Sequence, residues 1–72
     1  MTTYNGHRNW NYWNVSLWIN NDENLYRLAV RCVRYNRTKT QAAQDFIKQV
    51  PPKTKDGAKY TVPSIRAAMS EM

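Results

Sequence analysis

The sequence has few of the residues that build catalytic or metal sites. It contains one cysteine, one histidine, two glycines and five acidic residues. One cysteine cannot form an internal disulfide, on which small secreted domains usually depend. One histidine and one cysteine do not provide the ligand cluster of a zinc site, and two glycines do not form a glycine-rich phosphate loop. We therefore expect a protein that is not an enzyme and that uses neither a metal nor a cofactor.

Long apolar runs are also absent from the sequence. The longest nearly apolar window is VSLWI, residues 15–19, whereas about 20 apolar residues are needed to span a bilayer. The first fifteen residues include no apolar segment of the kind that signal peptides have. We expect a cytoplasmic protein that has no membrane partner.

Apolar and aromatic residues are well represented in the 72 residues. Apolar residues make up 42% of the chain, and three tryptophans and five tyrosines are among them. This content is too high for a disordered chain, and a chain of this length supports only one small core. We expect a single domain over residues 1–72, in which residues 1–8 form a flexible arm and His7 is an ordinary exposed or capping residue.

Helical patterns in four segments predict an all-α fold of three to four packed helices. Residues 9–21 fit both a helix and a strand. We favour a helix capped by Asn9, because nothing downstream offers a partner strand and a lone strand cannot satisfy its own backbone. Since this segment is apolar on most sides, we expect it to be the central helix.

Residues 22–36 have the clearest helical pattern, with Asn20 or Asn21 as the expected cap. The expected apolar stripe consists of Leu25, Leu28, Ala29, Cys32 and Val33, and is widened by Tyr26, Val30 and Tyr35. Arginines occupy the opposite face. Cys32 should be a buried core residue with an inert thiol, because an apolar environment raises the pKa of a thiol.

The second half of the chain has two further helical segments. Residues 38–50 form the third expected helix, which Pro51 and Pro52 end. Residues 51–60 form a lysine-bearing loop with a turn, or a short hairpin, around Asp56-Gly57. Residues 61–72 form the last helix, with Pro63 in its first turn.

A motif in the first half is close to N-Y-x-T-W-x-V-x-L-W-I-x-N-D. Its matching positions are Asn9, Trp13, Val15, Leu17, Trp18, Ile19, Asn21 and Asp22, and Asn5-Gly6 matches an Asn-Gly arm before it. Trp10 and Tyr12 stand where the motif has Tyr and Thr. This pattern resembles a family of small uncharacterised phage proteins, including those of cyanobacterial phages. The resemblance implies a phage-type protein in the host cytoplasm, and it implies no activity.

Positive charge is concentrated in the middle of the chain. Residues 25–59 contain nine basic and two acidic residues, whereas the rest is nearly neutral. Arg27, Arg31 and Arg34 recur on one helix face over about 10 Å, which matches two or so phosphates of a strand. The expected nucleic-acid-binding surface combines this face with the loop and consists of Arg27, Arg31, Arg34, Arg37, Lys39, Lys53, Lys55 and Lys59.

Other interpretations of the charge and the aromatic residues stay open. The basic face could be merely solvated, or it could bind an acidic host protein. Exposed Trp10, Tyr12 and Trp18 would suit an adaptor or inhibitor that binds a host protein, or a homodimer. Alternatively, Trp13, Trp18 and Tyr26 form the core.

A helix-turn-helix arrangement is a further hypothesis for the C-terminal half. In it, residues 61–72 are the recognition helix, and Ser64 and Arg66 face the bases. The connection from Pro51 to Thr61 is longer than the usual turn of this motif, which counts against it.

Overall fold

Four helices and a connecting loop make up residues 9–70 and 72, which are the residues that the computed structural model describes. The helices are α1 (Trp10–Asn21), α2 (Glu23–Tyr35), α3 (Lys39–Ile47) and α4 (Val62–Ala68). This arrangement confirms the all-α prediction and the helical interpretation of residues 9–21. The expected flexible arm, residues 1–8 with His7, lies outside the described residues.

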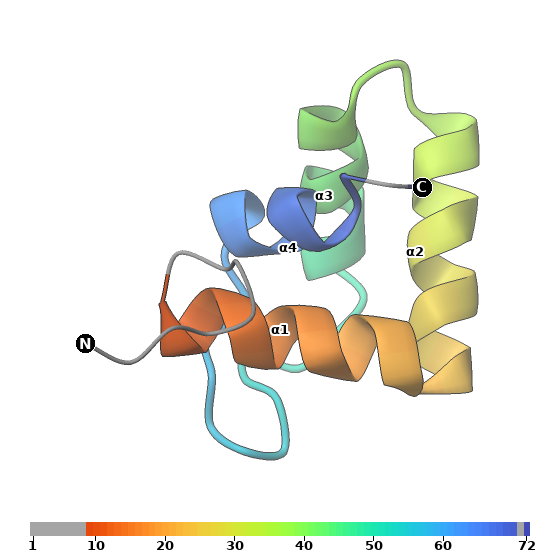
Figure 1. The fold of residues 1–72 in the computed structure, drawn as a ribbon. Helices are drawn as coiled ribbons and strands as arrows, with labels where there is room; N and C mark the ends of the chain where they lie inside the picture. The colour runs from red at the N-terminus through yellow and green to blue at the C-terminus, as the bar shows by residue number, and fades with distance from the viewer. Residues whose placement is uncertain (1–8, 71) are drawn as a thin grey trace.

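The helices pack as a ring in which each contacts two neighbours, in the order α1, α2, α3, α4 and back to α1. In Figure 1, α2 and α3 form an antiparallel pair, α1 runs across the base of this pair, and α4 lies above α1. The expectation that α1 is the central helix is therefore wrong. The apolar residues of α1 pack against α2 and α4 and beside the loop of residues 51–60, and helices do not surround α1 on all sides.

Each helix begins at a side chain that accepts a hydrogen bond from a backbone N–H of the first turn. These caps are Asn9, Asp22, Thr38 and Thr61. Asn9 is the expected cap of α1, but Asp22 caps α2 in place of Asn20 or Asn21. A carboxylate suits this place better than an amide, because its charge also interacts favourably with the positive end of the helix dipole.

Two helices are shorter than the sequence pattern indicates. α3 ends at Ile47 and α4 ends at Ala68, whereas helical periodicity continues to residues 50 and 72. At both ends the backbone tightens into bonds between residues three apart, such as Gln49 N–H to the Phe46 carbonyl at 2.9 Å and Ser70 N–H to the Ala67 carbonyl at 3.2 Å. Such tight turns are a common way to end a helix.

The core is built from small residues around Phe46. Its members are Val15, Ile19, Ala29, Cys32, Ala42, Ala43, Phe46, Ala58, Tyr60, Ile65, Ala68 and Met69. The rings of Phe46 and Tyr60 meet edge to face with their centroids 6.0 Å apart. Four of its five alanines lie on helices and allow these helices to approach closely, which leaves no room for tryptophan. The alternative in which Trp13, Trp18 and Tyr26 form the core is therefore wrong, because both tryptophans are half-buried and Tyr26 is 44% exposed.

Residues 51–60, called the lysine loop below, fold back on themselves beside α1. Lys53 and Lys59 form an isolated antiparallel bridge, and Gly57 takes a φ of 94° at the turn, a region that residues with a Cβ rarely adopt. The expected turn at Asp56-Gly57 is thus present. Within the described residues it is closed by this single bridge instead of a hairpin of two strands.

Hydrogen bonds fasten the lysine loop to α1. The Asp56 carboxylate accepts hydrogen bonds from Asn14 Nδ2 and Trp18 Nε1, both at 2.9 Å. The Thr54 hydroxyl donates to Asn14 Oδ1 at 2.7 Å. Asn14 is buried, so its amide forms a polar connection between helix and loop inside the protein.

Candidate nucleic-acid interface

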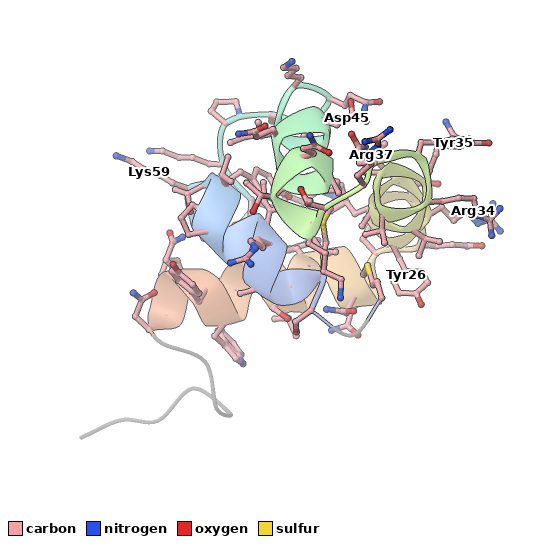
Figure 2. The ribbon with its side chains drawn as sticks, turned by 90° about the horizontal axis from the view of Figure 1, so that it is seen from above. Tyr26, Arg34, Tyr35, Arg37, Asp45 and Lys59 are labelled. Carbon is pink, nitrogen blue, oxygen red and sulfur yellow. The ribbon has the colours of Figure 1, made fainter. Side chains whose placement is uncertain are left out.

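Helix α2 stands at one end of the molecule, with one side packed against α1 and α3 and the other side open (Figure 1). The open side is called the outer face below and consists of Tyr26, Arg27, Val30, Arg31, Arg34 and Tyr35. Figure 2 shows Tyr26, Arg34 and Tyr35 extending from α2 away from the other helices. The packed side carries the buried Ala29 and Cys32, so the helix separates cleanly into a core side and a basic side.

The two tyrosines of α2 belong to the outer face. Tyr26 is 44% exposed and Tyr35 is 76% exposed, so the expectation that they widen the apolar stripe is wrong. At 100° per residue, Tyr26 and Tyr35 lie on the two edges of the half-circle that contains the arginines. Their angular position on the helix predicts this face. The prediction that they belong to the apolar stripe rested on residue type alone, and tyrosine is common both inside proteins and at their surfaces.

The outer face is hollowed between its side chains. All six of its residues line a depression of about 270 Å³. Arg27 forms an ion pair with Glu23, one turn earlier on α2, so the charge of this arginine is partly neutralised. Among the described residues, Arg31 and Arg34 form no ion pair, so their charges are free to bind a ligand.

A second hollow continues from the outer face across the turn to α3. It has a volume of about 560 Å³ and is lined by Tyr35, Asn36, Arg37, Gln41, Gln44, Asp45 and Lys48. Figure 2 shows Arg37 and Asp45 at this junction. Asp45 accepts hydrogen bonds from Asn36 at 3.3 Å and from Gln49 at 3.2 Å. Tyr35 borders both hollows, a position that helical periodicity alone does not indicate.

The other basic residues expected at the interface lie elsewhere. Lys59 is on the opposite side of the molecule from Arg34 (Figure 2), and the backbone bridge pairs it with Lys53. The Lys55 ammonium lies 5.6 Å from the centroid of the Trp18 ring. Lys39 Nζ donates a hydrogen bond to the Ser70 carbonyl at 2.6 Å. The structure therefore groups the arginines of α2 with Arg37 and separates them from the lysine loop.

The aromatic residues expected at a protein interface do not form one patch. Trp10 and Tyr12 are two positions apart on α1 and so point to nearly opposite sides of it. Trp10 is 39% exposed, whereas Tyr12 and Trp18 are half-buried. Tyr12 lines a hollow with Lys39 and Arg66, and the indole of Trp18 binds the lysine loop.

The structure contradicts the helix-turn-helix hypothesis. Ser64 is fully buried and forms a capping box with Thr61, so it cannot face a base. α4 packs against both α1 and α3. The short turn that a helix-turn-helix motif needs is found between α2 and α3, at residues 36–38, and not before α4.

Cys32 is confirmed as a core residue. Its side chain is 1% exposed, and burial, followed by the nearby charge of Asp45, raises the pKa of the thiol to about 11. The thiol is therefore protonated at neutral pH and is a poor nucleophile. Among residues 9–70 and 72, no group of three or more His, Cys, Asp or Glu side chains is placed to hold a metal ion. No helix in this part of the chain is long and apolar enough to cross a membrane.

Comparison with known proteins gives the chain a family without giving it a function. No curated protein and no solved structure matches it. The model of a family of unknown function, DUF7249, matches residues 1–72. The chain therefore belongs to the family DUF7249.

Proposed function

We propose that this protein is a non-catalytic accessory protein that binds nucleic acid through the outer face of α2. The observation that carries the proposal is the exposed pair Arg31 and Arg34, which form no ion pair with another described residue and lie between two exposed tyrosines. Arginines bind phosphates through charge and a planar set of donors. Tyrosine rings give bases a surface on which to stack. The outer face combines both kinds of group on one rigid helix.

The position of α2 supports this proposal. The helix has 13 residues and is therefore about 20 Å long. Because it stands at one end of the molecule, an extended polymer can lie along it without meeting another helix (Figure 1). A merely solvated face would need no tyrosine that is 76% exposed, since polar residues serve that purpose better.

The test is fluorescence anisotropy with labelled single-stranded and duplex oligonucleotides at low salt. We expect the double variant Arg31→Glu/Arg34→Glu to lose at least about tenfold in affinity, because two phosphate contacts become repulsive. The matched control is Lys53→Glu/Lys59→Glu, which changes the net charge equally on the opposite side of the molecule. An equal loss in both variants, or no binding by the wild type, would contradict the proposal.

An acidic protein partner is the second candidate function. It is favoured by the residue types of the outer face, because tyrosine and arginine are enriched among the residues that dominate protein interfaces. A pull-down from nuclease-treated lysate distinguishes the two. Recovery of one stoichiometric acidic protein, lost in Arg31→Glu/Arg34→Glu, together with no affinity for oligonucleotides, would favour the protein partner.

We also propose a phage-type origin and action in the cytoplasm of a host cell. The support for this is the resemblance of residues 9–22 to the motif of small phage proteins. The genomic neighbourhood tests it. Genes of this family that lie consistently among cellular housekeeping genes, with no phage genes beside them, would contradict the proposal.

A further inference from the structure

We infer that the nucleic acid is single-stranded and that Tyr35 is the platform on which an unpaired base stacks, between two adjacent binding hollows. This inference rests on the proposed function and names its substrate class. It starts from the place of Tyr35 at the last position of α2, where the chain turns toward α3. Tyr35 is the most exposed of the large apolar side chains in the described residues.

Tyr35 lines both hollows. The hollow of the outer face has Val30 and Tyr26 in its lining. The larger hollow includes Gln41 and Gln44. An exposed ring at a residue that lines both hollows can stack on a base of a strand that runs from one hollow to the other, as aromatic residues do in proteins that bind single strands. The exposed amides of the second hollow supply donors and acceptors for base edges.

Basic side chains lie on both sides of Tyr35. The hollow of the outer face carries Arg31 and Arg34, and the second hollow carries Arg37 and Lys48. A backbone that continues past Tyr35 therefore meets positive charge before and after the stacked base. Asp45 is the acidic member of the second hollow, and hydrogen bonds from Asn36 and Gln49 already occupy its oxygens.

The chemistry favours a single strand over a duplex. Bases within a duplex are stacked on each other and offer no free face to a protein ring, whereas unpaired bases can stack on aromatic side chains. A surface that acts by charge alone would prefer duplex DNA, because its charge density is higher. Preference for a single strand would therefore be a signature of base contact instead of phosphate contact.

The experiment compares oligothymidylate of about 20 nucleotides, which has no pairing partner, with a duplex of equal length at one salt concentration. We expect the wild type to bind oligothymidylate more tightly. Tyr35→Ala should lower this affinity about 5- to 150-fold, which is the range of the loss of one base–aromatic stack, and should leave duplex affinity nearly unchanged. Tyr35→Phe keeps the ring and should retain the wild-type affinity.

Two controls keep the outcomes separate. Trp10→Ala removes an exposed aromatic ring from α1 and should leave both affinities unchanged. Circular dichroism melting checks that Tyr35→Ala is folded. If the duplex is preferred or Tyr35→Ala has no effect, while Arg31→Glu/Arg34→Glu still abolishes binding, this inference fails and the proposed function stands. If the wild type binds neither oligonucleotide, both fail.

Discussion

At the scale of single residues, Asn14 is the buried polar group that joins α1 to the lysine loop. Its amide donates to Asp56 and accepts from the hydroxyl of Thr54. A buried hydroxyl that loses its partner costs about 1–3 kcal/mol. We therefore expect Asn14→Ala to lower the free energy of unfolding by that amount, as measured by urea denaturation.

The control for Asn14 is Asn11, which forms two hydrogen bonds with the backbone of Lys59 at an exposed site. Water can replace these bonds, so Asn11→Ala should lower the free energy of unfolding by less than about 1 kcal/mol. Equal losses in the two variants would show that burial of the Asn14 amide adds nothing to the free energy of unfolding.

Asp56 should make the stability of the protein depend on pH in the acid range. Hydrogen bonds from Asn14, and then from Trp18, lower the pKa of its carboxyl below the usual value. A group with a lowered pKa in the folded state stabilises the fold above its unfolded pKa, and this contribution is lost as the pH falls through the folded pKa. We expect the urea concentration at the unfolding midpoint of the wild type to decrease as the pH is lowered below about 4.

The variant Asp56→Asn isolates the contribution of this carboxyl to the pH dependence. Asparagine is similar in shape but does not titrate, so the stability difference between wild type and Asp56→Asn should be largest near neutral pH. It should shrink as the pH falls below the usual value of a carboxyl. A difference that stays constant from pH 7 to the acid range would contradict the role of the charge.

At the scale of elements, close packing of α3 depends on its alanines. Ala42 and Ala43 are fully buried, and α3 packs against both α2 and α4. Ala43→Leu forces extra volume into this contact and should cost about 1–3 kcal/mol of stability. Thermal melting measures it, and Gln44→Leu on the exposed side is the control. A stabilised Ala43→Leu variant would show unfilled space beside α3.

The sequence predicts the positions of the helices well and their surroundings less well. The cap residue Asn9 indicates where α1 begins, and periodicity places the start of α2 to within about one residue, because these signals are local and act before the helices pack. Which side of an element is covered depends on neighbours that are distant in the chain. Trp18 illustrates this, since its environment is the lysine loop, 38 positions away, and no periodicity within α1 could reveal that partner.

The candidate site could be predicted from the sequence in part. The basic face of α2 follows from the spacing of Arg27, Arg31 and Arg34, because helical geometry alone places them together. The lysine loop could not be assigned to a side, because its position depends on the bonds that fasten it to α1. The position of Tyr35 in the lining of both hollows depends on the conformation of the turn between α2 and α3. The sequence predicts where this turn lies in the chain but not how it is folded.

At the scale of the whole molecule, the net charge is +6, and two groups of basic residues lie on separate surfaces. The arginines of the outer face lie at one end, and Lys59 of the lysine loop lies on the opposite side (Figure 2). Exposed charges farther apart than the screening length of about 8 Å at physiological salt interact only weakly. We therefore expect a bound strand to contact one of these surfaces without the other.

The salt dependence of binding should reveal which surface makes the contacts. The logarithm of the binding constant for a single strand falls with the logarithm of salt concentration by about 0.7 for each phosphate neutralised. Arg31→Gln/Arg34→Gln removes two cations from the outer face and should make this slope shallower by about 1.4. Lys53→Gln/Lys59→Gln removes the same charge from the lysine loop and should leave the slope unchanged. Anisotropy titrations with oligothymidylate at several salt concentrations measure both slopes, and a change that follows the lysines would place the strand on the lysine loop.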